Sequence, residues 1–178
     1  MKTAARTSPG RSVAFRTLRR VFEEGAYADR ALLAEAGRVG LRGRDRAFAM
    51  RLAYGAVQRR ATLDHVAERL AGRPMERLDP PVVAALRLGL LQLLFLDAVP
   101  DHAAVGETVE LVKGPSPGGA RLVNAVLRRA AKEGPAIVAS MDDTTPAGAA
   151  LRHSHPVWIA ELLWDCLLYT SPSPRDRS

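Results

Sequence analysis

The sequence has little cysteine, no long apolar run and no secretion signal. Its 178 residues include one cysteine, Cys166, which excludes a disulfide framework and a cysteine-rich zinc site and favours a reducing compartment. The longest apolar stretch, residues 88–96, contains Gln92 and is far shorter than the ~20 residues of a membrane span. The N-terminus lacks the apolar core of a signal peptide. We therefore expect a cytoplasmic protein that makes no membrane contact.

Catalytic and metal-binding motifs are also absent from the sequence. No Gly-x-Ser-x-Gly turn is present to carry a nucleophilic serine. The glycine-rich loop at residues 114–119 lies between expected helices, whereas a cofactor-binding loop follows a strand. Asn124 is more simply explained as a buried amide than as a ligand. The four histidines are scattered without metal-ligand spacing: His65, His102, His153 and His155. We therefore predict no catalytic, metal-binding or cofactor-binding residue.

The residues that are abundant favour helices. The chain holds 30 alanines and 23 leucines against two isoleucines, and alanine and leucine are strong helix formers. No segment alternates apolar and polar residues for long enough to indicate a strand. The sequence therefore predicts an all-α fold. Helices are expected over about residues 9–24, 29–36, 44–60, 62–70 after a kink, 80–99, 101–113, 117–132 and 156–164.

Caps and apolar spacing predict the ends and faces of these helices. Ser8 and Pro9 are typical of an N-cap and a first helical residue, and Asp101 is expected to cap a later helix. Gly72, Arg73 and Pro74 are expected to stop the helix at 62–70. The helix at 80–99 is apolar on every side, which is typical of a central core helix. The helix at 44–60 is expected to bury one stripe with Phe48 and Leu52 beside it: Ala47, Met50, Tyr54 and Val57.

The positive charge is concentrated in the first third of the chain. Residues 1–60 hold 14 Lys and Arg against 5 Asp and Glu, or +9, and residues 61–178 hold 12 against 14, or −2, which gives the net +7. This asymmetry indicates an anionic partner for the N-terminal part. An ordinary solvated arginine face stays open as an alternative, because 23 arginines against three lysines also fits a GC-rich genome.

Arginines are placed where a phosphate would be favourable. Arg16, Arg19 and Arg20 share one helix face, opposite the apolar one. Other arginines flank two helix starts, where cations oppose the macrodipole at about 0.3–1 kcal/mol each and a bound phosphate would offset that cost. Asp64 is a competing partner for Arg60. The candidate nucleic-acid contacts are Arg6, Arg11, Arg16, Arg19, Arg20, Arg42, Arg44, Arg46, Arg59 and Arg60.

Several segments, in order, resemble a known family. They are Arg44–Phe48, Leu52–Arg60, Leu63–Asp64, Leu86–Gly89, Gln92–Leu94, Val99–Val105, Glu107–Glu110 and Leu122–Arg129. Over about residues 11–133 they resemble the N-terminal domain of RsmB/Sun-type enzymes, which methylate cytosine C5 in 16S ribosomal RNA. That domain is similar to the antitermination factor NusB, an all-helical RNA-binding fold. The resemblance implies a NusB-like helical bundle whose basic N-terminal helix meets RNA.

The resemblance also implies a division of the chain. Residues 1–10 form a basic tail, and a composition rich in Pro, Gly, Ala, Thr and Asp predicts a linker at 135–152. The resemblance gives a NusB-like RNA-binding domain at 11–134 and the start of the methyltransferase region at 153–165. Ser154–Trp158 carries the last assignment, because it is similar to the segment leading into that region. Residues 166–178 match no part of the family and resemble translated sequencing-adapter sequence, so Cys166 does not inherit the role of a catalytic thiolate.

The implied parent is an S-adenosylmethionine-dependent rRNA methyltransferase whose catalytic α/β domain has no room in this chain. We expect an RNA-binding fragment that is inactive alone, binds no cofactor and is separated from its C-terminal methyltransferase domain. Two alternatives stay open at this point. One is a NusB-type transcription antitermination module, and the other is a helical protein-interaction domain.

Overall fold

The structure, a computed structural model, describes residues 7–169, with side chains as far as Cys166. Its helices are α1 (Pro9–Glu24), α2 (Ala28–Arg38), α3 (Gly43–Gln58), α4 (Arg60–Ala71), α5 (Pro80–Phe95), α6 (Asp101–Lys113), α7 (Gly119–Ala139), α8 (Pro146–His153) and α9 (Val157–Tyr169), with a 3-10 turn, η1, at Met75–Arg77. Across this range no strand occurs, which confirms the all-α prediction. None of the helices in it is long and apolar enough to cross a membrane.

Local signals place several helix ends as predicted. Ser8 is the N-cap of α1, where its hydroxyl oxygen accepts the Arg11 backbone N–H at 3.4 Å, and Pro9 is the first helical residue. The missing N–H of proline costs nothing there, because the first N–H groups of a helix have no helical partner. Gly72 ends α4 with a φ of 66°, a left-handed conformation that glycine adopts without strain.

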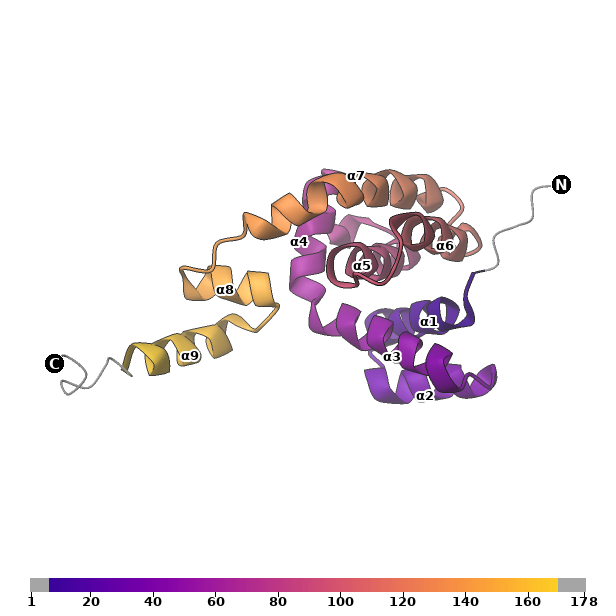
Figure 1. The fold of residues 1–178 in the computed structure, drawn as a ribbon, viewed down its shortest axis with the longest axis horizontal. Coiled ribbons are helices and arrows are strands. Elements are labelled where there is room, and N and C mark those ends of the chain that lie inside the picture. The colour runs from indigo at the N-terminus through magenta and orange to yellow at the C-terminus, as the bar shows by residue number, and fades with distance from the viewer. Residues whose placement is uncertain (1–6, 170–178) are drawn as a thin grey trace.

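The helices form two groups that meet at α1 and α5. α1 packs with α2 and α3, while α5, α6 and α7 pack with one another, and α1 also contacts α5. After a break at Arg59, α4 lies against α5 and α7. Figure 1 shows α8 and α9 continuing from α7 on the side of α4 that lies away from α6.

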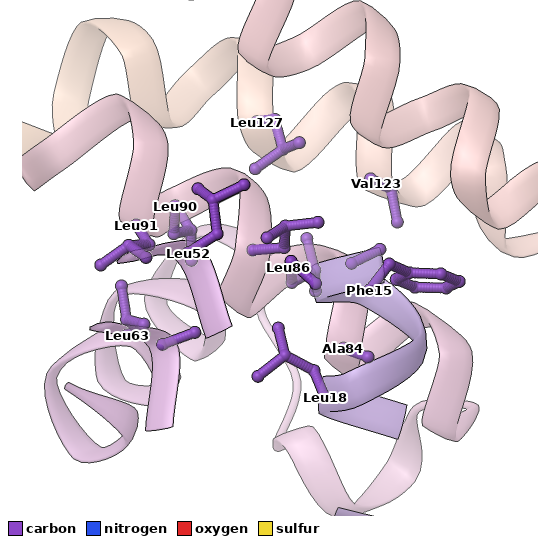
Figure 2. Packing of buried hydrophobic residues seen from close by; sticks show 14 of the residues in the cluster. Phe15, Leu18, Leu52, Leu63, Ala84, Leu86, Leu90, Leu91, Val123 and Leu127 are labelled. Atoms are coloured by element: carbon purple, nitrogen blue, oxygen red, sulfur yellow. The ribbon is translucent and has the colours of Figure 1, made fainter. Parts of the chain in front are cut away.

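α5 lies at the centre of the hydrophobic core. Every residue from 84 to 92 is buried, because α5 contacts α1, α3, α4, α6 and α7. A helix that is surrounded in this way is apolar on nearly all its faces, and Arg87 and Gln92 are its two buried polar residues. The prediction of a central core helix is confirmed. Figure 2 shows core residues from five helices: Phe15, Leu18, Leu52, Leu63, Leu86, Leu90, Leu91, Val123 and Leu127.

α3 buries a different stripe from the predicted one. Its buried residues are Ala49, Leu52, Ala53 and Ala56, whereas Ala47 and Met50 are exposed and Tyr54 and Val57 are only half-buried. The prediction is confirmed for Leu52 and wrong for Ala47 and Met50. Alanines lie on several sides of α3, so apolar spacing alone left its rotation open. Close packing against α1 and α5 selects the side with the smallest residues.

Three helix boundaries also differ from those predicted. α5 ends at Phe95, before the predicted residue 99, and Pro100 rather than Asp101 occupies the N-cap of α6. α7 continues through Pro135 to Ala139. A proline in a helix removes the hydrogen bond to the carbonyl four residues earlier, but Ile137 and Val138 beyond it pack against the core. The expected linker at 135–152 therefore contains the end of α7 and all of α8 except its last residue, His153.

α8 is attached to α4 by hydrogen bonds around the buried Thr62. The Thr62 hydroxyl donates to the Leu151 carbonyl oxygen at 2.9 Å and lies 2.6 Å from Ser154 Oγ. The Thr62 backbone N–H donates to Ser154 Oγ at 3.0 Å. Ser154 has a φ of 56°, and α9 packs on α8 after it. The segment expected to be a linker is thus folded against α4.

Candidate nucleic-acid interface

Two of the predicted arginines of α1 surround a buried glutamate of α2. The Glu35 side chain is 1% exposed, and its Oε2 accepts a hydrogen bond from Arg16 Nε at 3.0 Å. The other oxygen, Oε1, lies 3.5 Å from Arg20 Nη1 and 3.2 Å from Arg38 Nη1. A buried carboxylate is stable only when its charge is paired. Arg16 and Arg20 therefore hold α1 against α2, in addition to any role at the surface.

The other ion pairs of this face lie within α1. Arg19 Nε and Nη2 donate to the two oxygens of Glu23 at 2.6 and 2.8 Å, and this hydrogen bonding raises the pKa of Arg19 above its usual value. Arg20 Nε lies 3.3 Å from Glu24 Oε2. The hollow on this face is lined by four arginines and three glutamates. Its net charge is consequently +1, far less than the arginines alone would suggest.

Arg11 is an internal residue with a side chain only 8% exposed. Its Nε donates to Gln92 Oε1 at 2.6 Å, and its Nη1 donates to Glu107 Oε1 at 2.9 Å. The backbone N–H of Ser8 donates to Glu107 Oε2 at 2.7 Å. Because its charge is buried and paired, we withdraw Arg11 from the candidate interface. Arg6 lies outside the described residues.

Arg59 and Arg60, at the break between α3 and α4, lie against aromatic rings. Arg60 Nε is 3.5 Å from Asp64 Oδ2, as the spacing of these residues predicted, and its guanidinium lies 5.6 Å from the Phe22 ring centroid. Arg59 stacks on Phe95, with 4.1 Å between the guanidinium carbon and the ring centroid. No carboxylate pairs with Arg59 in the part of the chain that the structure describes. The positive charge of Arg59 is therefore available to an anionic ligand.

The arginines at the start of α3 are exposed. Arg42, Arg44 and Arg46 make no ion pair with any described residue. Arg42 is the N-cap of α3 and makes no side-chain capping hydrogen bond, so the first N–H groups of the helix have no side-chain partner and add positive partial charge. Asp45, in the first turn beside these arginines, is the only acidic residue of α3 and offsets one of their three charges. Three guanidiniums beside an uncapped helix N-terminus suit a phosphate group.

Arg51 belongs to the same surface and was missing from the predicted set. It is exposed and comes seven residues after Arg44, so the two side chains lie on one face of α3, two turns apart. Arg51 lines a hollow of about 430 Å³ between α3 and α5, together with Tyr54 and Arg59. The spacing of seven residues from Arg44 was the sequence signal that identifies it.

A groove of about 720 Å³ between α6 and α7 mixes charges of both signs. It is lined by Asp101, His102, Asn124, Arg128, Arg129, Lys132 and Glu133, among others. Asn124 is half-buried here, and its Oδ1 accepts a hydrogen bond from Arg128 Nε at 3.1 Å. The prediction of a buried amide at Asn124 is therefore wrong, because this residue faces the groove while the preceding Val123 faces the core. Among the described residues no group of three or more His, Cys, Asp or Glu is placed to hold a metal ion.

Comparison with known proteins identifies relatives along most of the chain. A putative methyltransferase of Mycobacterium tuberculosis is 41% identical over 166 residues, which is 89% of this chain and 36% of the relative. The ribosomal RNA small subunit methyltransferase B of Thermus thermophilus is 45% identical over 119 residues, covering 66% of this chain and 26% of the relative. A probable enzyme of the same name from Synechocystis is 35% identical over 85% of this chain and 34% of the relative. The chain thus spans about a third of the length of these relatives.

Solved structures share the helical architecture. The complex of antitermination factors NusB and NusE with double-stranded RNA contains a chain with a TM-score of 0.65 and 25% identity, covering 70% of this chain and 95% of that one. A chain in the structure of a plectonemic RNA supercoil gives a TM-score of 0.67 and 26% identity, covering 75% and 96%. The NusB family model itself matches residues 8–132. From its sequence and its helical bundle alike, the chain belongs to the NusB family.

Proposed function

We propose that the chain is the RNA-binding part of a methyltransferase that acts at cytosine C5 in small-subunit ribosomal RNA. The observation that carries the proposed RNA contact is the start of α3, where Arg42, Arg44 and Arg46 are exposed beside an uncapped helix N-terminus. These cations repel the positive end of the helix in the free protein. A phosphate bound among them would replace that repulsion with charge-assisted hydrogen bonds.

The lengths of the matches favour a methyltransferase parent over an antitermination factor. The methyltransferase relatives from M. tuberculosis and Synechocystis align with 85–89% of this chain. The solved chains in the NusB–NusE complex and the RNA supercoil match over 95–96% of their own length but cover only 70–75% of this chain. We infer that α8 and α9 lead toward the methyltransferase region, and that the parent works on ribosomal RNA in the cytoplasm.

We assign the cofactor of the parent to the part of the relatives that this chain does not match. S-adenosylmethionine would supply the methyl group there. The described residues form only helices, without the strand, turn and helix that cradle such a nucleotide-like cofactor, and Cys166 is exposed on α9. A methyl-transfer assay on the 178-residue chain should give no turnover above background, and turnover would overturn this assignment.

The exposed apolar side chains of α9 are a proposed contact with the same missing region. Trp158, Leu162 and Leu163 are 65%, 58% and 52% exposed. Grouped exposed apolar residues are typical of an interface, and the relatives are about three times as long as this chain. We propose that the methyltransferase region covers this face in the longer protein.

The proposed RNA contact is tested by binding of a labelled single-stranded RNA at increasing salt concentration. Each phosphate contact on a single strand contributes about −0.7 to the log–log slope. The variant Arg42→Ala, Arg44→Ala, Arg46→Ala should therefore have a slope shallower by about 2. The matched control is Arg69→Ala, Arg73→Ala, Arg77→Ala, which removes the same charge from exposed positions near η1 and should keep the wild-type slope. A flat salt response of the wild-type chain, or equal effects of both variants, would favour a protein-interaction domain instead.

A further inference from the structure

The hollow between α3 and α5 is a concave site with an apolar floor. Leu91 and Leu96 lie at its base and are only 2% and 8% exposed. Gly55 brings α3 close to α5 there, because a Cβ at Gly55 would lie 3.0 Å from a methyl group of Leu91. The volume of about 430 Å³ is in the range of small-ligand sites. We call this hollow the α3–α5 pocket.

Flat side chains form the walls of the α3–α5 pocket. Tyr54 and Phe95 are both half-buried, and the guanidinium of Arg59 lies flat enough on Phe95 to keep its carbon 4.1 Å from the ring centroid. Aromatic rings and arginine guanidiniums are the groups on which unpaired nucleobases stack. Gln58, also on the lining, carries an amide with both donors and an acceptor for a base edge.

Charge and aromatic rings together distinguish this pocket. Its lining includes Arg51 and Arg59 and no carboxylate. By contrast, the α6–α7 groove contains Asp101 and Glu133, and the hollow beside α1 contains three glutamates. A hollow lined by Arg42 and Arg46 also lacks a carboxylate, but it has no aromatic ring, so it offers charge without a stacking surface.

The pocket lies in line with the arginines at the start of α3. Arg44, Arg51 and Gln58 follow one another at intervals of seven residues, so they form a single row along the helix with about 10.5 Å between successive members. A strand whose phosphates contact Arg44 and Arg51 would therefore run along α3 toward Tyr54 and Arg59. The row supplies the charge, and the pocket supplies the stacking surfaces.

We propose that the α3–α5 pocket binds an unpaired base of the RNA strand held along α3, stacked between Tyr54 and the Arg59–Phe95 pair. This inference rests on the proposed RNA-binding function. It adds the prediction that the chain distinguishes a strand with accessible bases from a bare chain of sugar phosphates.

The experiment compares two probes of equal charge on the intact 178-residue chain. One is a labelled ten-nucleotide oligouridylate, and the other is the same oligonucleotide with all bases removed. Wild-type protein should bind the oligouridylate about tenfold more tightly, which is the effect of one stacked base. Tyr54→Leu keeps an apolar side chain and Arg59→Lys keeps the charge, and each should bring the ratio of the two Kd values close to one. Arg73→Lys, in the loop after α4, is the control and should leave the ratio unchanged.

Each outcome has a distinct meaning. If both probes bind with the same Kd and the salt dependence of binding is steep, the pocket proposal is wrong while the RNA-binding function stands. If neither probe binds, the pocket proposal and the proposed RNA-binding function are both wrong. Uridine 5′-monophosphate should fail to displace the oligouridylate at comparable concentration, and efficient displacement would identify a free-nucleotide site rather than a site for a strand. Circular dichroism melting confirms that the variants are folded, and Arg59→Lys keeps the test decisive if Tyr54→Leu loses stability.

Discussion

Single residues decide how much of the basic N-terminal part is available to a ligand. Arg11 and Arg44 are both arginines close to a predicted helix start, yet one is buried against Gln92 and Glu107 and the other is exposed. Arg11 joins α1 to α5 and α6, because its guanidinium donates to Gln92 of α5 and to Glu107 of α6. Its charge therefore serves the stability of the fold.

Arg11→Ala should lower the free energy of unfolding by about 3 kcal/mol, because it leaves the carboxylate of Glu107 and the amide of Gln92 without their buried partner. Urea unfolding followed by circular dichroism measures this change. Arg44→Ala is the matched control and should change stability by less than about 0.5 kcal/mol, as expected for an exposed residue. Equal effects of the two variants would contradict the division between internal and available arginines.

The sequence could predict that the N-terminal part is basic, but not which arginines are free. Arg11 is separated from its partners Gln92 and Glu107 by 81 and 96 residues, and no local pattern reports such contacts. Glu35, likewise, is read from the sequence as an ordinary helical glutamate, although it is buried beside three guanidiniums. Pairing of this kind depends on how α1 meets α2, which is a property of the folded chain.

At the scale of elements, the contact between α5 and α7 depends on small residues. A Cβ at Gly119, the first residue of α7, would overlap Val82 Cγ2 and lie 2.7 Å from Ser116 Oγ. Valine is branched at Cβ and has little rotamer freedom in a helix, so it cannot move aside easily. A Cβ at Gly118, one residue earlier, would have no atom within 4 Å, and Gly118 already has a helical φ of −64°.

Gly119→Ala should therefore destabilise the protein by about 1–3 kcal/mol, as an overpacked contact does. Gly118→Ala should instead be neutral or stabilise by about 0.4–1 kcal/mol, because alanine restricts the unfolded chain without strain in the native one. The two midpoints of urea unfolding give the comparison. A destabilising Gly118→Ala paired with a neutral Gly119→Ala would show that the start of α7 packs differently.

The ends of helices differ in how well the sequence predicts them. Ser8, Pro9 and Gly72 act through their own backbone and side-chain chemistry, so they could be located in advance. The end of α7 could not, because Pro135 is a local stop signal that is outweighed by the packing of Ile137 and Val138 against the core. The burial of α3 was unpredictable for a related reason, since its several alanines fit equally well on either side.

α7 is also joined to α4 by a pH-sensitive contact. Arg129 Nη1 donates to the Leu70 carbonyl oxygen at 2.7 Å, while its Nε and Nη2 donate to Glu133 at 3.1 and 2.9 Å. The hydrogen bond from Arg129 is the main reason that the pKa of Glu133 is lowered. Glu133 therefore contributes stability above the pKa of an unfolded glutamate, about 4.3, and loses that contribution as the pH falls through its lower folded value.

We expect Glu133→Gln to be less stable than wild type at about pH 7. It should approach wild type as the pH falls below the lowered pKa of Glu133, where both proteins carry a neutral side chain at this position. The difference is small, because both partners are about half exposed and water screens the pair. Urea midpoints of the two proteins at each pH give the measurement. A difference that is constant from neutral to acidic pH would mean that the charge of Glu133 has no role.

At the scale of the whole molecule, α8 and α9 form an annex that is held by few contacts. Thr62 of α4 provides hydrogen bonds to Leu151, Arg152 and Ser154, and Figure 1 shows both helices outside the main bundle. Regions with few buried contacts open at a lower free energy than the core. The annex should therefore detach from α4 without unfolding of α1–α7.

Thr62→Val keeps the shape of the side chain and removes its hydroxyl, so it should raise the rate of hydrogen exchange in α8 severalfold more than in α5. Exchange measured by mass spectrometry on peptides of the two helices provides the comparison. Ser140→Ala, which removes a hydroxyl bonded only to the nearby Ile137 carbonyl, is the control and should leave α8 protected. Uniform acceleration in both helices with Thr62→Val would mean that the annex and the bundle open together.

The contact between Ser8 and Glu107 also constrains when the protein can fold during synthesis. The two residues are 99 positions apart, so the start of α1 stays without its partner until α6 has left the ribosome. At about 5–20 residues per second, synthesis of the intervening chain takes on the order of 5–20 seconds. Throughout that interval Arg11 is a free cation on a nascent chain, and it becomes internal only when α6 arrives. Arg11 is therefore exposed to the surrounding RNA of the ribosome during synthesis, although it is internal in the folded protein.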